Sequence, residues 1–245
     1  MINHNKKSAF TLSEVLITLG IIGVVAALTI PSFLTKIQNK GYVEHLNKTY
    51  SLLQTITNKI VEEEGEPQNW ILDAYSIGSH EPNEKVVDMY TKKMNVAKIC
   101  ERKDLNLTKE TPCVLKNQEY YTLDGVSNPV LINDAWGLYS SSYPLLLADG
   151  SSIALLFMSN PNGGFHWGFP DLTFIVDVNG KKKPNKIGRD IFLLYMDKRD
   201  GGKISPFLKE KLSGSTPERL IDDCKDGGKG FSCAYKVISE GKMNY

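Results

Sequence analysis

An uncharged apolar segment near the N-terminus constrains this chain more than any other feature. No charged residue occurs from Val15 to Thr35, and the run of apolar residues continues to about Leu34. Its length is close to the ~20 residues that a helix needs to span a bilayer. Downstream, charges of both signs alternate as on a solvated surface, and the formal net charge of the chain is only +1. This separation predicts a membrane segment followed by a soluble domain.

The residues before the apolar segment predict its orientation. Lys6 and Lys7 precede it, and basic residues favour keeping the adjacent end of a span in the cytoplasm. A secretory signal peptide also has a basic start, but its apolar core is usually only ~7–15 residues long and closes with small residues at a cleavage site. No such site stands out after Leu34. We therefore expect a single pass through the inner membrane, with the N-terminus cytoplasmic and the C-terminal domain extracytoplasmic.

Glu14 interrupts the apolar character near the start of this segment. A carboxylate inside a membrane span is costly and by default marks a functional position. The plainer interpretation is that Glu14 lies at the headgroup level, only one helical turn into the segment. A functional role predicts a specific cationic partner for Glu14.

The stretch Ala-Phe-Thr-Leu-Ser-Glu-Val-Leu, residues 9–16, resembles the prepilin processing motif of type IV pilins and type II secretion pseudopilins. The resemblance implies that a membrane aspartic peptidase cleaves between Ala9 and Phe10 and that the new N-terminus is methylated. It matches Glu14 to the family's glutamate and Pro31 to its helix-kinking proline. The family usually has Gly in place of Ala9, and because Ala is also small we still expect cleavage. Residues 1–9 are then the leader peptide.

Cleavage would place a cationic amine on Phe10, with a reference pKa of ~7.7–8.0. Inside a filament core of packed apolar helices, this amine and the Glu14 carboxylate are each costly alone. They compensate one another when paired between neighbouring subunits. We therefore expect Glu14 to fix the register of assembly.

The pattern after the membrane segment predicts an amphipathic helix over residues 36–64. Apolar residues recur there every three or four positions, which forms one apolar face: Val43, Leu46, Tyr50, Leu53, Ile56 and Ile60. With the apolar segment this makes one long helix, half transmembrane and half amphipathic, kinked at Pro31. A second helix is predicted over residues 84–96.

Strand and turn signals dominate from about Tyr120 onward. Residues 144–147 and 153–157 read as a hairpin around Asp149-Gly150, and residues 172–178 and 190–196 as a second strand pair. The fold class predicted is α+β, a pilin-like layout in which the long helix packs on an antiparallel sheet. We expect residues 10–35 to form the filament-core helix and residues 36–245 the extracytoplasmic domain.

All four cysteines lie in the predicted extracytoplasmic part, at Cys100, Cys113, Cys224 and Cys233. Two local pairs in an oxidising compartment suit disulfides, although the sequence leaves the connectivity open. Four buried thiols in a cytosolic protein are the alternative. A structural zinc site is disfavoured, because neither pair has the close spacing that zinc ligands prefer.

Two further groups of residues allow a binding interpretation. Asp177, Asn179 and Asp190 are weak calcium candidates, but the spacing of an EF-hand and its closing Glu are missing. A turn built on Asn179-Gly180 is the favoured interpretation, and no metal is expected. Five basic residues follow nearby: Lys181, Lys182, Lys183, Lys186 and Arg189. A solvated loop explains them better than DNA phosphates, so DNA binding is not expected.

The sequence therefore predicts a structural subunit of a type IV pilus or a type II secretion-type filament. Its predicted partners are a prepilin peptidase/N-methyltransferase, other pilin subunits, the inner membrane and the assembly platform. We expect no cofactor and no enzymatic activity, because no spacing among the four histidines indicates a metal site or a triad. The alternatives are a membrane-anchored binding or adhesion protein and an anchored extracytoplasmic enzyme. The sequence does not separate a pilus from a secretion pseudopilus, or a major from a minor subunit.

Overall fold

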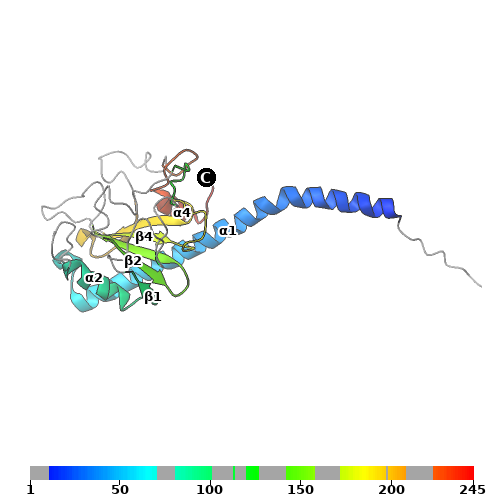
Figure 1. The fold of residues 1–245 in the computed structure, drawn as a ribbon. Helices are drawn as coiled ribbons and strands as arrows, with labels where there is room; N and C mark the ends of the chain where they lie inside the picture. The colour runs from blue at the N-terminus through cyan, green and yellow to red at the C-terminus, as the bar shows by residue number, and fades with distance from the viewer. Residues whose placement is uncertain are drawn as a thin grey trace, which may run out of the picture. The chain divides into compact units, whose positions relative to one another are not determined.

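The computed structural model describes residues 11–70, 81–100, 113, 120–126, 142–157, 172–196, 198–207 and 223–245. The chain divides into two compact units, residues 1–40 and residues 41–245. A single helix, α1 (Leu12–Glu64), supplies the described part of the first unit and continues into the second (Figure 1). It runs through Pro31 without a break in the assigned helix.

The second unit contains a six-stranded sheet in the order β1-β2-β3-β4-β5-β6, with each strand antiparallel to its neighbours. The strands are β1 (Val96–Ile99), β2 (Ser142–Leu147), β3 (Ser152–Phe157), β4 (Leu172–Asp177), β5 (Ile191–Met196) and β6 (Ile204–Pro206). The helices are α2 (Glu81–Thr91) and α4 (Cys233–Glu240), with short 3-10 turns η1 (Pro67–Asn69) and η7 (Lys198–Asp200). The α+β pilin-like fold class is confirmed.

The main core lies between the sheet and the second half of α1. Leu46, Leu53 and Ile60 are fully buried on one face of this helix, as the three-and-four spacing predicts. They share a core cluster with alternate residues of the strands, such as Leu155 and Phe174. Burying a large apolar side chain stabilises a fold by about 1.5–3 kcal/mol, so this face holds the helix against the sheet.

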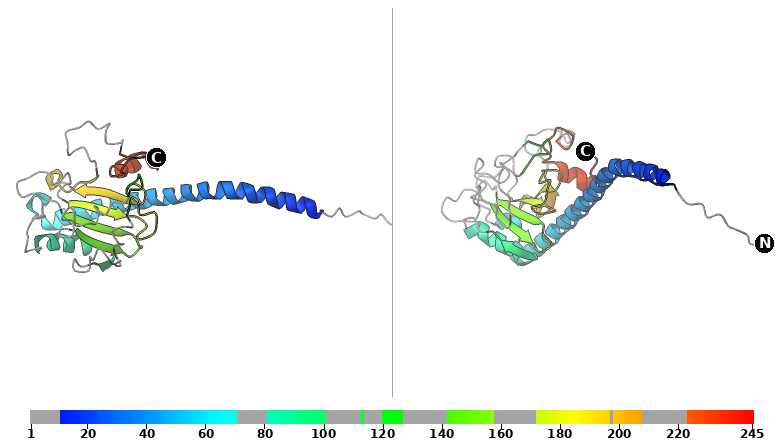
Figure 2. Two further views of the ribbon diagram at one scale, coloured as in Figure 1. Left: turned by 45° about the horizontal axis from the view of Figure 1, so that its top comes forward. Right: turned by 45° about the vertical axis from the view of Figure 1, so that its right-hand side comes forward.

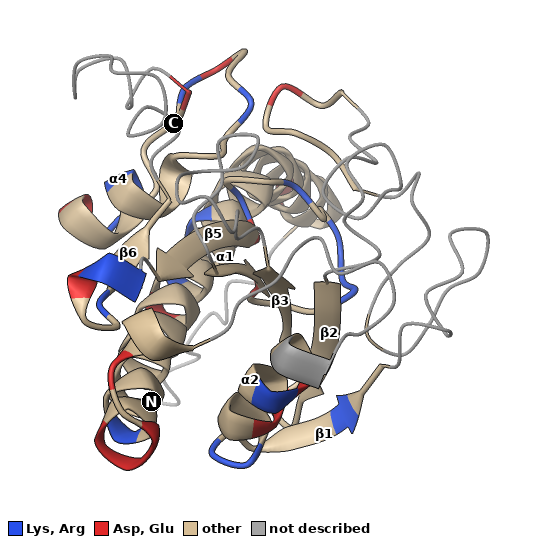
Figure 3. Cartoon of the chain, turned by 90° about the vertical axis from the view of Figure 1, so that its left-hand side faces the viewer, with Lys and Arg blue, Asp and Glu red and all other residues tan. Residues whose placement is uncertain are grey.

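The opposite face of the sheet is also covered. Leu156, Ile175 and Leu193 alternate with the residues that face α1 and belong to a second buried cluster, together with Ile187 and Phe207. Every residue of β4 and β5 is therefore buried. Charged residues are absent from β2, β3 and β5, which Figure 3 draws without blue or red.

Helix α2 packs on the same core as α1. Its Tyr90 is fully buried and makes an edge-to-face contact with Phe174, with the ring centroids 5.3 Å apart. The hydroxyls of Tyr90 and Thr57 lie 2.8 Å apart as a buried hydrogen-bonded pair. This pair satisfies both polar groups and ties α2 to α1. The predicted helix over residues 84–96 is wrong at its C-terminal end, because α2 stops at Thr91 and Val96 begins β1.

Helix α4 closes the fold near the C-terminus, beside the last strands of the sheet (Figure 2). Cys233, Ala234 and Val237 are its buried residues, and Gly241 ends it in the left-handed conformation with φ 67°. The two predicted strand pairs are confirmed to within two residues at each end. The sequence analysis missed α4, β1 and β6.

Candidate functional site

The candidate site is the N-terminal end of α1, where the helix begins in the apolar segment. Thr11 precedes the first helical residue, and Glu14 follows it three positions later. The Glu14 backbone N–H donates to Thr11 Oγ1 at 3.2 Å, and the Thr11 backbone N–H donates to Glu14 Oε2 at 2.8 Å. The Thr11 hydroxyl also donates to Glu14 Oε2 at 2.7 Å. This is a capping box, in which two residues satisfy each other's free backbone donors.

The capping box determines where the Glu14 carboxylate lies. Acidic side chains are stabilised at the N-terminus of a helix by its dipole, and here two donors of Thr11 hold one carboxylate oxygen. Sequence reasoning singled out Glu14 but missed Thr11. The signal was present, because Thr-Leu-Ser-Glu before an apolar run is the sequence pattern of a capping box.

The apolar segment that follows presents its side chains outward. Large apolar residues from Leu12 to Ile37 are at least 41% exposed, and none of the most apolar stretch of α1 is buried. The helix is long and apolar enough to cross a membrane, a test that an N-terminal signal sequence also passes. Exposed apolar surface on this scale requires a lipid or protein environment.

Hydroxyl groups within the apolar segment are satisfied by the helix itself. Thr29 Oγ1 donates to the Val25 carbonyl at 2.9 Å and Thr35 Oγ1 to the Pro31 carbonyl at 3.0 Å. Thr18 and Ser32 make the same kind of bond to carbonyls three residues earlier. Unsatisfied polar groups are costly in hydrocarbon, so these bonds make the segment compatible with a membrane interior.

The predicted cleavage residues, Ala9 and Phe10, lie outside the part of the chain that the structure describes. Glu14 and Pro31 lie 17 residues apart on α1. Because Pro31 has no backbone N–H, the Ala27 carbonyl lacks its usual helical donor.

Disulfides join Cys100 to Cys113 and Cys224 to Cys233. The second bond links the segment before α4 to its first residue, and Gly188 packs against it. An added Cβ at Gly188 would lie 2.8 Å from Cys233 Sγ, and the φ of 79° there also favours glycine. The C-terminal Tyr245 donates its hydroxyl to the Gly188 carbonyl. The disulfide-bonded segment therefore holds the turn between β4 and β5.

The calcium candidates are both buried: Asp177 is the last residue of β4, and Asp190 lies in the turn that follows. The backbone N–H groups of Asn185 and Lys186 donate to the two Asp190 oxygens at 2.8 and 2.7 Å. The Asn179 N–H donates to Asp177 Oδ1 at 3.3 Å. Burial raises the pKa of Asp190 to about 6, against the opposing effect of the Lys186 and Asn185 bonds. Burial and the charge of Asp190 raise the pKa of Asp177 well above its usual range.

These bonds explain the two carboxylates as the internal supports of a tight turn. No group of three or more His, Cys, Asp or Glu side chains is placed to hold a metal ion within the ranges that the structure describes. Asn179 adds a second role, because its Nδ2 donates to the Tyr42 hydroxyl at 3.0 Å and to the Lys183 carbonyl at 3.2 Å. It thereby links the turn to α1.

A second link to α1 comes from the turn between β2 and β3. Asp149 Oδ2 lies 3.2 Å from both His45 Nε2 and Lys48 Nζ, on α1. Although burial opposes it, hydrogen bonds from Ser151 and Lys48 lower the pKa of Asp149 to about 2. Asp149 was predicted only as a turn residue, because the contact joins residues about a hundred positions apart.

Comparison with known proteins bears on the N-terminal segment. Residues 4–30 match the family model of the prokaryotic N-terminal methylation motif. No curated protein and no solved structure matches the chain. The matched residues include the predicted cleavage position, the capping box and most of the apolar run. The chain thus carries the prokaryotic N-terminal methylation motif, which is the N-terminal signature of type IV pilins and pseudopilins.

Proposed function

We propose that this protein is a structural filament subunit, a pilin or pseudopilin of a type IV pilus or a type II secretion-type filament. A prepilin peptidase cleaves it between Ala9 and Phe10 and methylates the new N-terminus. The mature subunit is anchored in the inner membrane with its C-terminal domain on the extracytoplasmic side. It joins other pilin subunits through α1. The observation that carries this proposal is the methylation motif over residues 4–30, followed directly by an exposed apolar helix.

The capping box supports a specific role for Glu14 in assembly. Its carboxylate accepts two bonds from Thr11 through Oε2, whereas Oε1 has no hydrogen bond among the side-chain contacts that the structure gives for the helix start. In the proposed filament, Oε1 pairs with the Phe10 amine of a neighbouring subunit. Such an ion pair is strong in an apolar environment when both groups also have hydrogen bonds.

Processing is tested by expressing the full chain with a prepilin peptidase and measuring the mass of the mature protein. The expected N-terminus is N-methylated Phe10. An intact Met1, or cleavage after Ala26 or Ala27, contradicts the proposal and leaves an ordinary anchor or signal peptide.

Assembly is tested by replacing Glu14 with Ala, with Ser13→Ala as the matched control on the same helical turn. We expect Glu14→Ala to remain in the membrane but to lose filament incorporation by at least tenfold, because a neighbour's amine would be left unpaired. Ser13→Ala should assemble normally. Sheared filaments and membrane fractions are compared by immunoblotting. Normal incorporation of Glu14→Ala would favour the alternative, a membrane-anchored binding or adhesion protein with a pilin-type anchor.

A further inference from the structure

The dipeptide Asn179-Gly180 lies at the start of the turn between β4 and β5. Asn-Gly is a favourable turn sequence. It is also the dipeptide in which asparagine deamidates most readily, because glycine has no side chain to hinder attack by its backbone nitrogen. In this turn Gly180 is buried and Asn179 is half-buried. The surrounding fold therefore determines how fast this chemistry proceeds.

Deamidation of Asn179 would proceed through a cyclic imide. The Gly180 backbone nitrogen loses its proton and bonds to Asn179 Cγ, the Cγ–Nδ2 bond breaks, and ammonia leaves. Water then opens the ring to aspartate or isoaspartate, so the net change replaces an amide by a carboxylate. The reaction needs a nitrogen that is free to attack, an amide that can turn toward it, and support for the negative charge that develops on Oδ1.

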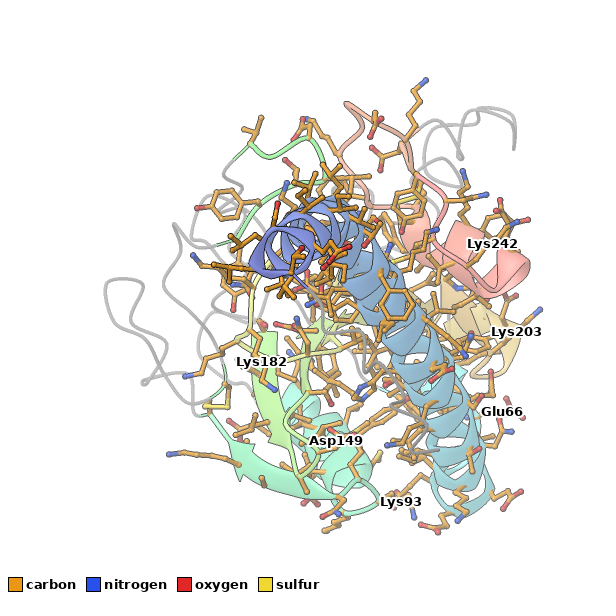
Figure 4. The ribbon with its side chains drawn as sticks, turned by 90° about the vertical axis from the view of Figure 1, so that its right-hand side faces the viewer. Glu66, Lys93, Asp149, Lys182, Lys203 and Lys242 are labelled. Carbon is orange, nitrogen blue, oxygen red and sulfur yellow. A yellow bond between two sulfur atoms is a disulfide. The ribbon has the colours of Figure 1, made fainter. Side chains whose placement is uncertain are left out.

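The turn holds the attacking nitrogen in place. The Gly180 N–H donates to the Asp177 carboxylate, and Gly180 packs against the turn between β2 and β3. An added Cβ on Gly180 would lie 2.2 Å from the Gly150 carbonyl oxygen. Figure 4 shows Lys182 and Asp149, which belong to these two turns, on the same side of α1. The Gly180 backbone therefore cannot rotate into the attacking position unless the two turns separate.

The side chain of Asn179 is also held in place. Its Nδ2 donates to the Tyr42 hydroxyl at 3.0 Å and to the Lys183 carbonyl at 3.2 Å, so the leaving amide is bonded both to α1 and to the turn. Its Oδ1 is buried and has no hydrogen-bond donor among the residues that the structure describes. The negative charge that develops on this oxygen during attack therefore has no support.

The product of deamidation does not fit this turn. Residue 179 would lose the donor hydrogens that bond Tyr42 and Lys183, and it would gain a carboxylate. The Asn179 side chain also hydrogen-bonds with Asp190, so the new charge would lie against an acid that is already buried. Because Tyr42 belongs to α1, losing its bond to residue 179 would release the turn from the helix.

We propose that Asn179-Gly180 is a latent deamidation site, at which the folded turn blocks the reaction and the product releases the turn from α1. The modification consumes only water and is irreversible, so any event that opens the turn makes the release permanent. The same contacts explain why this dipeptide suits the turn: Gly180 has no room for a side chain, and Asn179 supplies the bond to Tyr42. This inference does not depend on filament assembly.

Peptide mapping of the full chain in detergent tests the block. Deamidation of Asn179 is followed by mass spectrometry during incubation in mildly alkaline buffer, with and without urea. Asn162-Gly163, the second Asn-Gly of the chain, shows in the same urea samples how fast the unfolded dipeptide reacts. We expect Asn179 to react at least about tenfold more slowly in the folded chain than in urea, because the turn must open first. Equal rates in the two conditions would overturn the proposal.

A matched pair of tyrosine variants identifies the contact responsible. Tyr42→Phe removes the acceptor of the Asn179 amide, whereas Tyr50→Phe removes a hydroxyl from the same helix that donates to the Ile204 carbonyl. Tyr42→Phe should speed deamidation of Asn179 by roughly fivefold, the factor that one lost hydrogen bond gives. Tyr50→Phe should leave the rate unchanged. An equal change in both variants, or none in Tyr42→Phe, contradicts the block.

Asn179→Asp tests the release, because it introduces the product directly. Amide hydrogen exchange in residues 178–190 should become several-fold faster in this variant. Asn162→Asp, the same change at the other Asn-Gly, is the control and should leave exchange in residues 178–190 unaltered. Unaltered exchange in Asn179→Asp would show that the product does not release the turn. The deamidation rates are measured on chains that keep Asn179, so they test the proposal independently of how well Asn179→Asp folds.

Discussion

Single residues of this protein show how a buried charge is used to shape a loop. Asp190 is completely buried, yet both of its oxygens accept backbone N–H bonds from the loop that it supports. Asp177 lies close enough for their charges to interact. Two buried carboxylates without a cation are unfavourable when both are ionised. The hydrogen bonds therefore order the turn, whereas ionisation of both buried carboxylates lowers its stability.

This balance predicts that the protein becomes less stable as the pH rises from about 4 to 6. The folded pKa of Asp190 is about 6, compared with an ordinary value of 3.8 for an aspartate, so in this window the folded state retains a proton that the unfolded state has lost. Stability falls by up to ~3 kcal/mol across it, at 1.36 kcal/mol for each pKa unit. The raised pKa of Asp177 acts in the same direction. Urea midpoints measured at pH 5 and pH 7 test the expectation.

Two variants distinguish the contribution of Asp190 to this pH dependence from that of other acids. Asp190→Asn should remove most of the decrease in stability between pH 4 and 6. Asp149→Asn should leave it intact, because the folded pKa of Asp149 is about 2 and this carboxylate is ionised in both states above pH 5. A wild-type midpoint that rises between pH 5 and pH 7 would contradict the assignment.

At the scale of helices and strands, the sequence predicted those elements correctly that depend on a local pattern of residues. The 3.6-residue spacing from Val43 to Ile60 places the buried face of α1, and the Asp149-Gly150 turn places the β2–β3 hairpin. The second helix ends early because residues 92–95 turn the chain into β1, which pairs with β2 from far along the sequence. Such pairing depends on tertiary contacts that no local pattern encodes.

The candidate site follows the same division. Glu14 was predicted because a carboxylate in an apolar run is conspicuous, whereas its capping by Thr11 required attention to helix-start chemistry. The contacts of Asn179 with Tyr42 and of Asp149 with His45 could not be predicted, because each joins segments that are about a hundred or more residues apart. Disulfide connectivity also needed the fold.

The segment before α4 depends on its disulfide, and its removal should be measurable. Replacing Cys224 and Cys233 by Ser releases a short closed loop, which costs about 2–3 kcal/mol on the chain-entropy estimate. Both cysteines are also fully buried in the main core, so the polar hydroxyls add to the loss. Urea unfolding of the full chain in detergent should show the decrease. The Cys100→Ser/Cys113→Ser variant is the comparison, since Cys100 directly follows β1, the strand at one edge of the sheet.

Amide exchange in residues 178–190, the turn between β4 and β5, shows whether the Cys224–Cys233 disulfide supports that turn or only α4. The Cys224–Cys233 variant should also expose Lys186 and Lys229 to faster amide exchange, because Gly188 packs on Cys233 and the Lys229 N–H bonds Asp223 beside Cys224. Unchanged exchange in the loop, with stability reduced, would show that the disulfide acts on α4 alone.

At the scale of the whole molecule, the two halves of α1 differ in burial and therefore in role. Within the described ranges, Val43 is the first residue of the chain that belongs to a buried core cluster. The large apolar side chains up to Ile37 are exposed. One half of the helix is therefore an element of the folded domain, and the other is a surface that needs lipid or neighbouring subunits. This separation supports the proposed function, in which the exposed half of α1 packs first in the membrane and then against other subunits.

This separation predicts that a chain starting at Gly41 folds without the membrane segment. Its core is complete among the described residues, so we expect a soluble monomer whose urea midpoint at pH 5 is close to that of the full chain in detergent. A chain starting at Leu53 is the matched control. It loses Val43 and Leu46 from the core, at roughly 2–5 kcal/mol for each large buried side chain removed, and it should not fold. Equal behaviour of the two truncations would mean that the first half of the amphipathic helix contributes little, and that α1 does not anchor the domain as its buried face indicates.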